Sequence, residues 1–322
     1  MNEPIRWGVL GTGRIAQTFA RDLALTTSGV IASVGSRSNE GMHRFADAFG
    51  VVGRHDSYEA LVADPSVEAV YVATPHPMHA ANALLALAHG KHVLVEKAFT
   101  MNAAEARLVV DAARERGLFA MEAMWTRFLP HVVAIRKILS SGELGTVVAV
   151  HADHGKWFEP DPQFRLFAPE LGGGALLDLG VYPVSFASMV LGEPTTVRAM
   201  ITPAFTGVDG QTSMLFGYDS GAQAVLTCTS LARSATRASI VGTEARIDID
   251  GDFYAPTSFT LTDRDGGSRR FEFTTEGRGL HHQAVEAARC IRAGETESPV
   301  MPLNETITVM ETMDRVLSFL DA

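Results

Sequence analysis

Short apolar runs alternate with amphipathic stretches through the first third of this 322-residue chain. The runs predict strands, and the stretches predict helices that return the chain to one edge of a parallel sheet. The predicted strands are 5–10, 30–35, 69–73, 93–96 and 118–121, and the predicted helices are 15–25, 38–49, 79–89 and 102–116. We therefore predict an α/β fold whose first domain, residues 1–122, is a doubly wound parallel sheet.

The pattern changes near residue 123. The further predicted elements are a strand at 147–152 and helices at 130–140, 282–293 and 305–320. Between them, residues 196–273 alternate apolar and polar side chains between turns, which is typical of a mostly antiparallel sheet. Asn304 is the expected N-cap of the last helix. We predict a second, α+β domain over 123–322 on a large open sheet, with a final helix that can pack back on the first domain.

Composition excludes several kinds of function. The net charge is −10, whereas a nucleic-acid surface needs clustered Lys and Arg. We find no apolar run of bilayer length, and Met1-Asn2-Glu3-Pro4 lacks the basic and apolar segments of a signal peptide. The two cysteines, Cys228 and Cys290, give no disulfide framework or thiolate metal cluster, and we expect both to be buried hydrophobes. We expect a cytoplasmic protein without a nucleic-acid or membrane partner.

Gly11-Thr12-Gly13-Arg14-Ile15-Ala16 is a GxGxxA sequence between a predicted strand and a predicted helix. The first glycine permits a tight turn, the second lets the backbone approach a pyrophosphate, and Ala16 lets helix and strand pack closely. Backbone N–H groups and the helix dipole then face the anion. The motif predicts a dinucleotide-binding Rossmann domain with Gly11, Gly13, Arg14 and Ile15 at the cofactor.

The end of the second predicted strand indicates which dinucleotide binds. An Asp or Glu at this position usually accepts hydrogen bonds from the ribose of NAD, but here the residues are Ser36-Arg37-Ser38. A guanidinium between two hydroxyls suits a 2′-phosphate, because arginine makes forked, charge-assisted hydrogen bonds. We therefore expect NADP(H), with Ser36 and Arg37 as ligands. The alternative is that Arg37 lies over the adenine or in solvent.

Four further segments resemble one family, the glucose–fructose oxidoreductase/inositol dehydrogenase family (Gfo/Idh/MocA). The segments 72–79 (VATPHPMH) and 90–97 (GKHVLVEK) resemble its cofactor loop and its lysine signature. The segments 121–128 (MEAMWTRF) and 172–182 (GGGALLDLGVY) are similar to the branch that holds dimeric dihydrodiol dehydrogenases and D-xylose dehydrogenase-like enzymes. The resemblance spans nearly the whole chain and is specific through residue 191.

The resemblance implies hydride transfer between a nicotinamide and a ring carbinol or carbonyl of a sugar, polyol or trans-dihydrodiol. It also implies three catalytic residues, which are Lys97, Asp178 and Tyr182 in this chain. One position departs from the family pattern, because Ala98 stands where the family has proline after the lysine. The fixed φ of proline is lost there, so we expect a looser pose of Lys97.

Further residues are expected around the same chemistry, among them Trp125 and Arg127, which the resemblance places beside the cofactor. The expected cofactor contacts are Thr74, Pro75, His79, Glu96, Lys97, Trp125 and Arg127. We expect His79 to cap the following helix near the nicotinamide ribose. The expected substrate contacts are His154, Trp157, Phe158 and Tyr182. The alternatives are a surface or structural role for His154 and packing of a domain interface by Trp157 and Phe158. We expect no metal at His76 and His79, because no carboxylate or thiolate group accompanies them and nicotinamide chemistry needs none.

Tyr182 is the expected proton donor and acceptor. The pKa of a tyrosine phenol in water is about 10, and the ammonium of Lys97 would favour the phenolate of Tyr182. Asp178 would orient Lys97 or a substrate hydroxyl. In the alternative assignment, Lys97 carries the proton and Tyr182 only orients the substrate.

Two other functions stay open from the sequence. The first is a different ring substrate, such as an inositol or an anhydro-sugar. The second is a non-catalytic NADP-binding regulator, which the retention of Lys97, Asp178 and Tyr182 disfavours. We also expect a homodimer, because no predicted helix covers one face of the sheet over 196–273.

Overall fold

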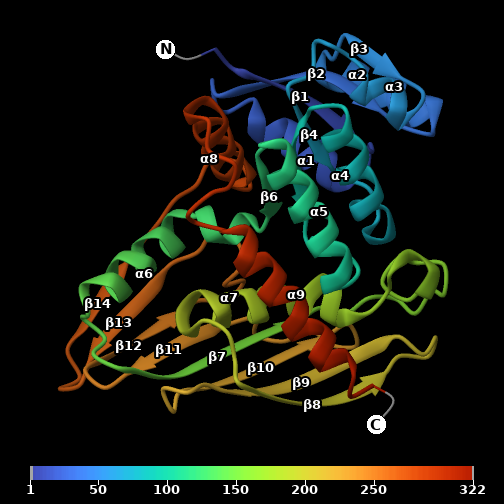
Figure 1. Ribbon diagram of the computed structural model, residues 1–322. Coiled ribbons are helices and arrows are strands. Elements are labelled where there is room, and N and C mark those ends of the chain that lie inside the picture. The colour runs from blue at the N-terminus through green and yellow to red at the C-terminus, as the bar shows by residue number, and fades with distance from the viewer. Residues whose placement is uncertain (1–2, 321–322) are drawn as a thin grey trace. The chain divides into compact units, whose positions relative to one another are not determined.

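The computed structural model describes residues 3–320. Met1 and Asn2, the first two residues of the N-terminal segment discussed above, lie outside the described residues. The chain forms two compact units (Figure 1). Unit 1 comprises residues 3–125 and 276–307, and unit 2 comprises residues 126–275 and 308–320. Each unit is built on one sheet.

The sheet of unit 1 has six strands in the order β3-β2-β1-β4-β5-β6, and its neighbouring strands are parallel. The strands are β1 (Ile5–Leu10), β2 (Gly29–Gly35), β3 (Gly53–His55), β4 (Ala69–Val72), β5 (His92–Glu96) and β6 (Ala120–Ala123). The helices are α1 (Arg14–Leu23), α2 (Asn39–Phe49), α3 (Tyr58–Val62), α4 (His79–Ala88), α5 (Ala103–Arg116) and α8 (Leu280–Ala293), with the 3-10 turn η1 (His76–Met78). The predicted doubly wound sheet is confirmed. Its strand order reverses between β1 and β4, where sheets of this kind bind ligands at their carboxyl edge.

Two strands of unit 1 differ from the prediction. The prediction missed β3, because it has only three residues and such a run is too short for a periodic pattern. β6 begins at Ala120 rather than at Leu118. Gly117 adopts a left-handed φ of 61°, and the N–H of Leu118 donates to the carbonyl of Ala113, so these residues still close α5.

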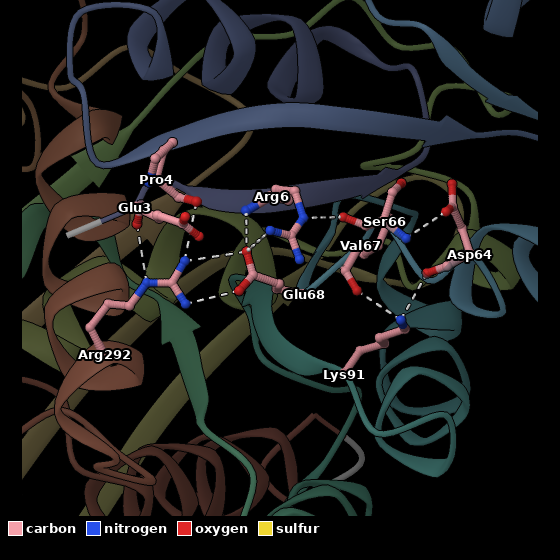
Figure 2. A network of polar contacts seen from close by, with 9 residues as sticks. All are labelled: Glu3, Pro4, Arg6, Asp64, Ser66, Val67, Glu68, Lys91 and Arg292. Carbon is pink, nitrogen blue, oxygen red and sulfur yellow. Dashed lines mark hydrogen bonds and ion pairs between the residues drawn. The ribbon is translucent and has the colours of Figure 1, made fainter.

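A network of polar contacts ties α8 to the start of the first sheet (Figure 2). The guanidinium of Arg292 donates to Glu68 at 2.8 Å and to the backbone carbonyls of Glu3 and Pro4 at 3.1 Å. Glu68 also accepts from the backbone N–H of Arg6 at 3.0 Å. Partial burial would raise the pKa of Glu68, but these hydrogen bonds outweigh it and hold that pKa below its usual value. Residues close to the C-terminus are thus part of unit 1.

The sheet of unit 2 has eight strands in the order β14-β13-β12-β11-β7-β10-β9-β8. β7 and β10 are parallel, and the other neighbours are antiparallel, as predicted for a mostly antiparallel sheet. The strands are β7 (Val147–Gly155), β8 (Thr196–Pro203), β9 (Asp209–Gly217), β10 (Gln223–Thr229), β11 (Ala238–Gly242), β12 (Ala245–Ile249), β13 (Phe259–Asp263) and β14 (Ser268–Phe271). Figure 1 shows α6 (Pro130–Ser141) and α7 (Val181–Leu191) on one face of this sheet. The fold class is therefore confirmed.

A π-helical turn, η4 (Leu176–Gly180), leads directly into α7. The sequence predicts only a continuous apolar segment here, because a π-turn has no distinct hydrophobic period. Such turns occur often at functional sites. η4 carries Asp178, and the first turn of α7 carries Tyr182.

The predicted cap of the last helix is wrong. α9 (Leu303–Leu317) begins before Asn304, so this residue lies inside the first turn. Its side chain accepts a hydrogen bond from Arg114 at 2.9 Å instead. The N–H of Leu303 donates to Glu297 at 2.7 Å, and this contact supplies the acceptor that an N-cap would provide.

The expectation that no apolar run reaches bilayer length is also wrong. The helical segment Pro169–Leu191 has 23 residues and a mean hydropathy of 1.5, which is enough to cross a membrane by length and composition. However, 78% of the 18-residue window that has this hydropathy is buried inside the protein. This burial is typical of a core helix, and α7 packs on β7 and β10 of the sheet.

Candidate active site

The turn between β1 and α1 has the geometry that its glycines predict. Gly11 has a φ of 95°, and a Cβ at this residue would lie 2.8 Å from the carbonyl oxygen of Ala73. Only glycine tolerates both conditions. A Cβ at Gly13, in contrast, would meet nothing within 4 Å. The missing side chain of Gly13 therefore leaves open space beside the turn, as the approach of a pyrophosphate requires.

The N-terminus of α1 is suited to an anion. Gly13 is its N-cap, and within the described residues no side chain caps the helix. The first N–H groups of a helix need partners from outside it, and the helix dipole favours negative charge there. Arg14 and Ile15 are exposed at this end, whereas Ala16 is buried against the sheet. The turn thus fits the pyrophosphate of a dinucleotide cofactor.

The loop after β2 is ordered by its two serines. The hydroxyl of buried Ser36 accepts from the N–H of Ser38 at 3.1 Å, and the hydroxyl of Ser38 caps α2. Arg37 lies between them and is exposed. The nearest acid, Glu40, pairs with Arg44 one helical turn further on at 3.2 Å. This loop therefore presents a guanidinium and a helix N-terminus, which suits a phosphate better than a ribose diol.

The loop after β4 is held from inside by His79. One ring nitrogen lies 2.8 Å from the carbonyl oxygen of Thr74, and the other lies 2.9 Å from that of Ala98. The expectation that His79 caps α4 is wrong, because the N-cap is Met78 and the ring points into the protein. Burial lowers the pKa of His79. Thr74 is buried and Pro75 is exposed, so their assignment to the cofactor stays a prediction.

Lys97 follows a fixed carboxylate. Glu96, the last residue of β5, is buried and accepts a hydrogen bond from the hydroxyl of Tyr71. Its second oxygen accepts from the N–H of Lys97 at 3.3 Å. The peptide bond between Lys97 and Ala98 is cis. The parallel order of β4 and β5 puts Thr74 and Lys97 at the same carboxyl edge of the sheet.

In unit 2, Asp178 and Tyr182 lie on consecutive turns. Asp178 accepts a hydrogen bond from Arg165 at 3.0 Å, and its side chain is 10% exposed, compared with 47% for Arg165. Tyr182 is buried in the first turn of α7. Lys97 belongs to unit 1, so its cooperation with these two residues stays a prediction.

Tyr182 is part of an aromatic cluster. Its ring centroid lies 5.3 Å from that of His154 and 4.7 Å from that of Tyr254. His154 and Tyr254 stack at 4.4 Å. The ammonium of Lys156 donates to the hydroxyl of Tyr254 at 2.6 Å and lies 4.8 Å from the ring centroid, so it contacts the hydroxyl and not the ring face.

Tyr254 and Lys156 are not among the predicted site residues. The two are 98 positions apart and belong to no motif, so sequence reasoning had no means of pairing them. The nearest signal is that Lys156 follows His154 at the end of β7. The cluster gives the surroundings of Tyr182 both aromatic surface and hydrogen-bond donors.

Four other residues predicted to contact the cofactor or the substrate differ in exposure and in their neighbours. Trp157 is 58% exposed, and Phe158 packs on Phe164 with ring centroids 5.5 Å apart. Trp125 is buried, with the guanidinium of Arg278 5.9 Å from its ring. Arg127 is buried in unit 2 and donates to the carbonyl oxygen of Ser185 at 2.7 Å. These roles at the cofactor and the substrate stay predictions.

Cys228 and Cys290 are free and buried, which confirms their predicted character. Between residues 3 and 320, no group of three or more His, Cys, Asp or Glu side chains is arranged to hold a metal ion.

Comparison with known proteins assigns the family. Residues 5–124 match an oxidoreductase family with an NAD-binding Rossmann fold, and residues 132–248 match the GFO/IDH/MocA C-terminal domain. The chain is 34% identical to a D-xylose 1-dehydrogenase (NADP(+)) of Hypocrea jecorina, over 97% of this chain and 91% of that enzyme. It is 36% identical to a trans-1,2-dihydrobenzene-1,2-diol dehydrogenase of Sus scrofa, over 97% and 96% of the two chains.

Two solved structures are similar to this chain over nearly its whole length. The crystal structure of a 3-ketoreductase from Actinomadura kijaniata with NADP and TDP-benzene has a TM-score of 0.85 at 27% identity, covering 98% of this chain and 97% of that one. An aldose-aldose oxidoreductase from Caulobacter crescentus, complexed with glycerol, has a TM-score of 0.89 at 22% identity, covering 99% and 98%, and shows the fold alone. The predicted resemblance is confirmed, and the chain belongs to the Gfo/Idh/MocA family of oxidoreductases.

Proposed function

We propose that this protein is an NADP(H)-dependent dehydrogenase or reductase that acts on a ring carbinol or carbonyl of a sugar, polyol or trans-dihydrodiol. The observation that carries the proposal is the near full-length similarity to a D-xylose and a dihydrodiol dehydrogenase. The phosphate turn of unit 1 and the Asp178–Tyr182 segment of unit 2 support it. Most of the expected cofactor contacts belong to the predicted first domain, 1–122, whereas Trp125, Arg127 and the expected substrate contacts belong to the predicted second domain, 123–322.

In the proposed mechanism, a bound nicotinamide supplies or accepts the hydride. Tyr182 donates the proton to the substrate oxygen during reduction and removes it during oxidation. Lys97 holds that oxygen, and its ammonium favours the phenolate that remains on Tyr182. Asp178, which Arg165 orients, accepts a hydrogen bond from a neighbouring substrate hydroxyl.

A panel of substrates assayed in both directions tests this function. We expect NADP(H)-linked turnover of D-xylose, D-glucose or trans-dihydrodiols, because a D-xylose and a dihydrodiol dehydrogenase are similar to this chain over nearly its full length. Turnover of acyclic aldehydes alone would refute the ring specificity. Binding of NADPH without turnover of any compound would favour a regulator.

Arg37→Ala is expected to weaken NADPH binding by about 1.5–3 kcal/mol, because it removes a charge-assisted hydrogen bond to the 2′-phosphate. NADH lacks that phosphate, so its affinity should not change. Arg44→Ala is the matched control, since Arg44 is an exposed cation of the neighbouring helix that already pairs with Glu40. Titration calorimetry with both cofactors measures this, and equal NADPH affinity in Arg37→Ala and wild type would contradict it.

We also propose a homodimer formed through the open face of the eight-stranded sheet. Leu215 and Val225 are direct cross-strand partners on this face and are 46% and 45% exposed, and Met200 on β8 is 72% exposed. Covering such an apolar surface is favourable. Sedimentation at micromolar concentration should give a dimer, and Leu215→Arg should give a monomer. A strictly monomeric wild type would contradict the proposal.

A further inference from the structure

A buried carboxylate lies against the turn that carries Asp178. Asp209, the first residue of β9, is 4% exposed, and its Oδ2 accepts a hydrogen bond from the N–H of Leu176 at 2.6 Å. Gly174 has a φ of 126°, and a Cβ there would lie 2.1 Å from Oδ1 of Asp209. The glycine therefore makes room for the carboxylate as well as for the turn.

The contact acts where η4 begins. The first N–H groups of a helical segment have no partner inside it, and a negative charge is favourable at that end. Asp178 lies two residues beyond Leu176, and Tyr182 follows on the next turn.

We propose that ionised Asp209 is a positioning residue that fixes the start of η4 and so sets the orientation of Asp178 and Tyr182. This inference rests on the proposed catalytic roles of those two residues. Asp209 itself has no role at the reacting atoms. It acts through the backbone, in the way that partners of functional residues hold them in a productive geometry.

The burial of Asp209 should make the activity depend on pH. Burial raises its pKa to about 7, although the amides of Leu176 and Ala175 oppose this shift. The titratable side chain that faces Asp209 from β10 is Cys228, and burial raises the pKa of that thiol, which stays neutral. Below about pH 7 the carboxyl takes up a proton and loses its charge and one acceptor site. Activity should therefore fall as the pH drops through this range.

Stability should change in the opposite direction. The pKa of Asp209 is higher in the folded protein than its reference value of 3.8, so the folded state binds this proton more tightly between about pH 4 and about pH 7. The contribution of Asp209 to the free energy of unfolding thus decreases as the pH rises through that window. A loss of activity at low pH that reflected global unfolding would show the reverse relation.

Asp209→Asn tests the inference, with Asp153→Asn as the matched control. Asp153 also binds backbone N–H groups in unit 2, those of Thr236 and Arg237, at 2.8 and 2.9 Å. We expect Asp209→Asn to lower kcat by about 10²-fold above neutral pH, because small displacements of catalytic groups have effects of that order. It should also abolish the acid limb of kcat/KM near pH 7 and leave NADPH affinity unchanged, whereas Asp153→Asn should keep the limb.

Two further measurements separate the possible failures. Normal kcat in Tyr182→Phe would overturn the proposed function, whereas an inactive Tyr182→Phe with an unchanged acid limb in Asp209→Asn would overturn only this inference. Amide hydrogen exchange of wild type, corrected for the intrinsic effect of pH, gives an answer even when Asp209→Asn does not fold. Protection at Leu176 should fall on the acid side of about pH 7, and constant protection would contradict the inference.

Discussion

Tyr182→Phe is expected to lower kcat by about 10²–10⁴-fold, which is the usual contribution of a positioned acid–base group. In the proposed mechanism, hydride transfer leaves charge on the substrate oxygen, and the phenol of Tyr182 discharges it. Phenylalanine keeps the ring that packs on His154 and Tyr254, so only the hydroxyl is lost. NADPH affinity should therefore change little. Steady-state and single-turnover rates at saturating substrate measure the effect.

Tyr218→Phe is the matched control for this variant. Tyr218 is also a buried tyrosine of unit 2, and burial raises its pKa to about 12, so its phenol stays protonated at neutral pH. It follows the end of β9 and has no part in the proposed site. Its removal should leave kcat unchanged. A near-normal kcat in Tyr182→Phe would mean that the substrate proton comes from another group.

The first unit was largely predictable because its signals are local. A strand, a glycine turn and a helix lie within 20 consecutive residues, and the φ of 95° at Gly11 is the kind of conformation that selects glycine. The signal for NADP(H), which is the lack of an Asp or Glu directly after β2, is equally local. The three-residue strand β3 was missed because its pairing with β2, and not its own pattern, makes it a strand.

The surroundings of Tyr182 could not be predicted in the same way. Lys156 and Tyr254 meet across the sheet, and Asp209 reaches Leu176 across 33 positions. Such contacts depend on the order of strands, which no motif encodes. His79 shows a related failure, since its place at a predicted helix start suggested a cap. In the structure its ring bridges two loop carbonyls, because both loops converge at the carboxyl edge of the sheet.

Lys97→Met is expected to lower kcat by about 10²–10³-fold, the usual effect of removing one group that stabilises a developing oxyanion. The decrease should be smaller than that in Tyr182→Phe, because water or Tyr182 can still hold the substrate oxygen. In the proposed mechanism the phenolate of Tyr182 then loses the ammonium that favours it, so the pH at which oxidation reaches half its maximal rate should also rise. The rates of Lys97→Met and Tyr182→Phe, measured across pH, give the order of the two effects and the shift in the half-maximal pH.

Lys91→Met is the control for Lys97→Met, because both lysines belong to the same segment of the chain. The ammonium of Lys91 donates to the carbonyls of Asp64 and Val67 at 2.8 and 2.7 Å (Figure 2), so its loss should reduce stability without changing kcat. In the rival assignment Lys97 carries the proton. That assignment predicts the opposite ranking, with Lys97→Met almost inactive and Tyr182→Phe only mildly impaired. Near-normal rates in both variants would place the chemistry at other residues.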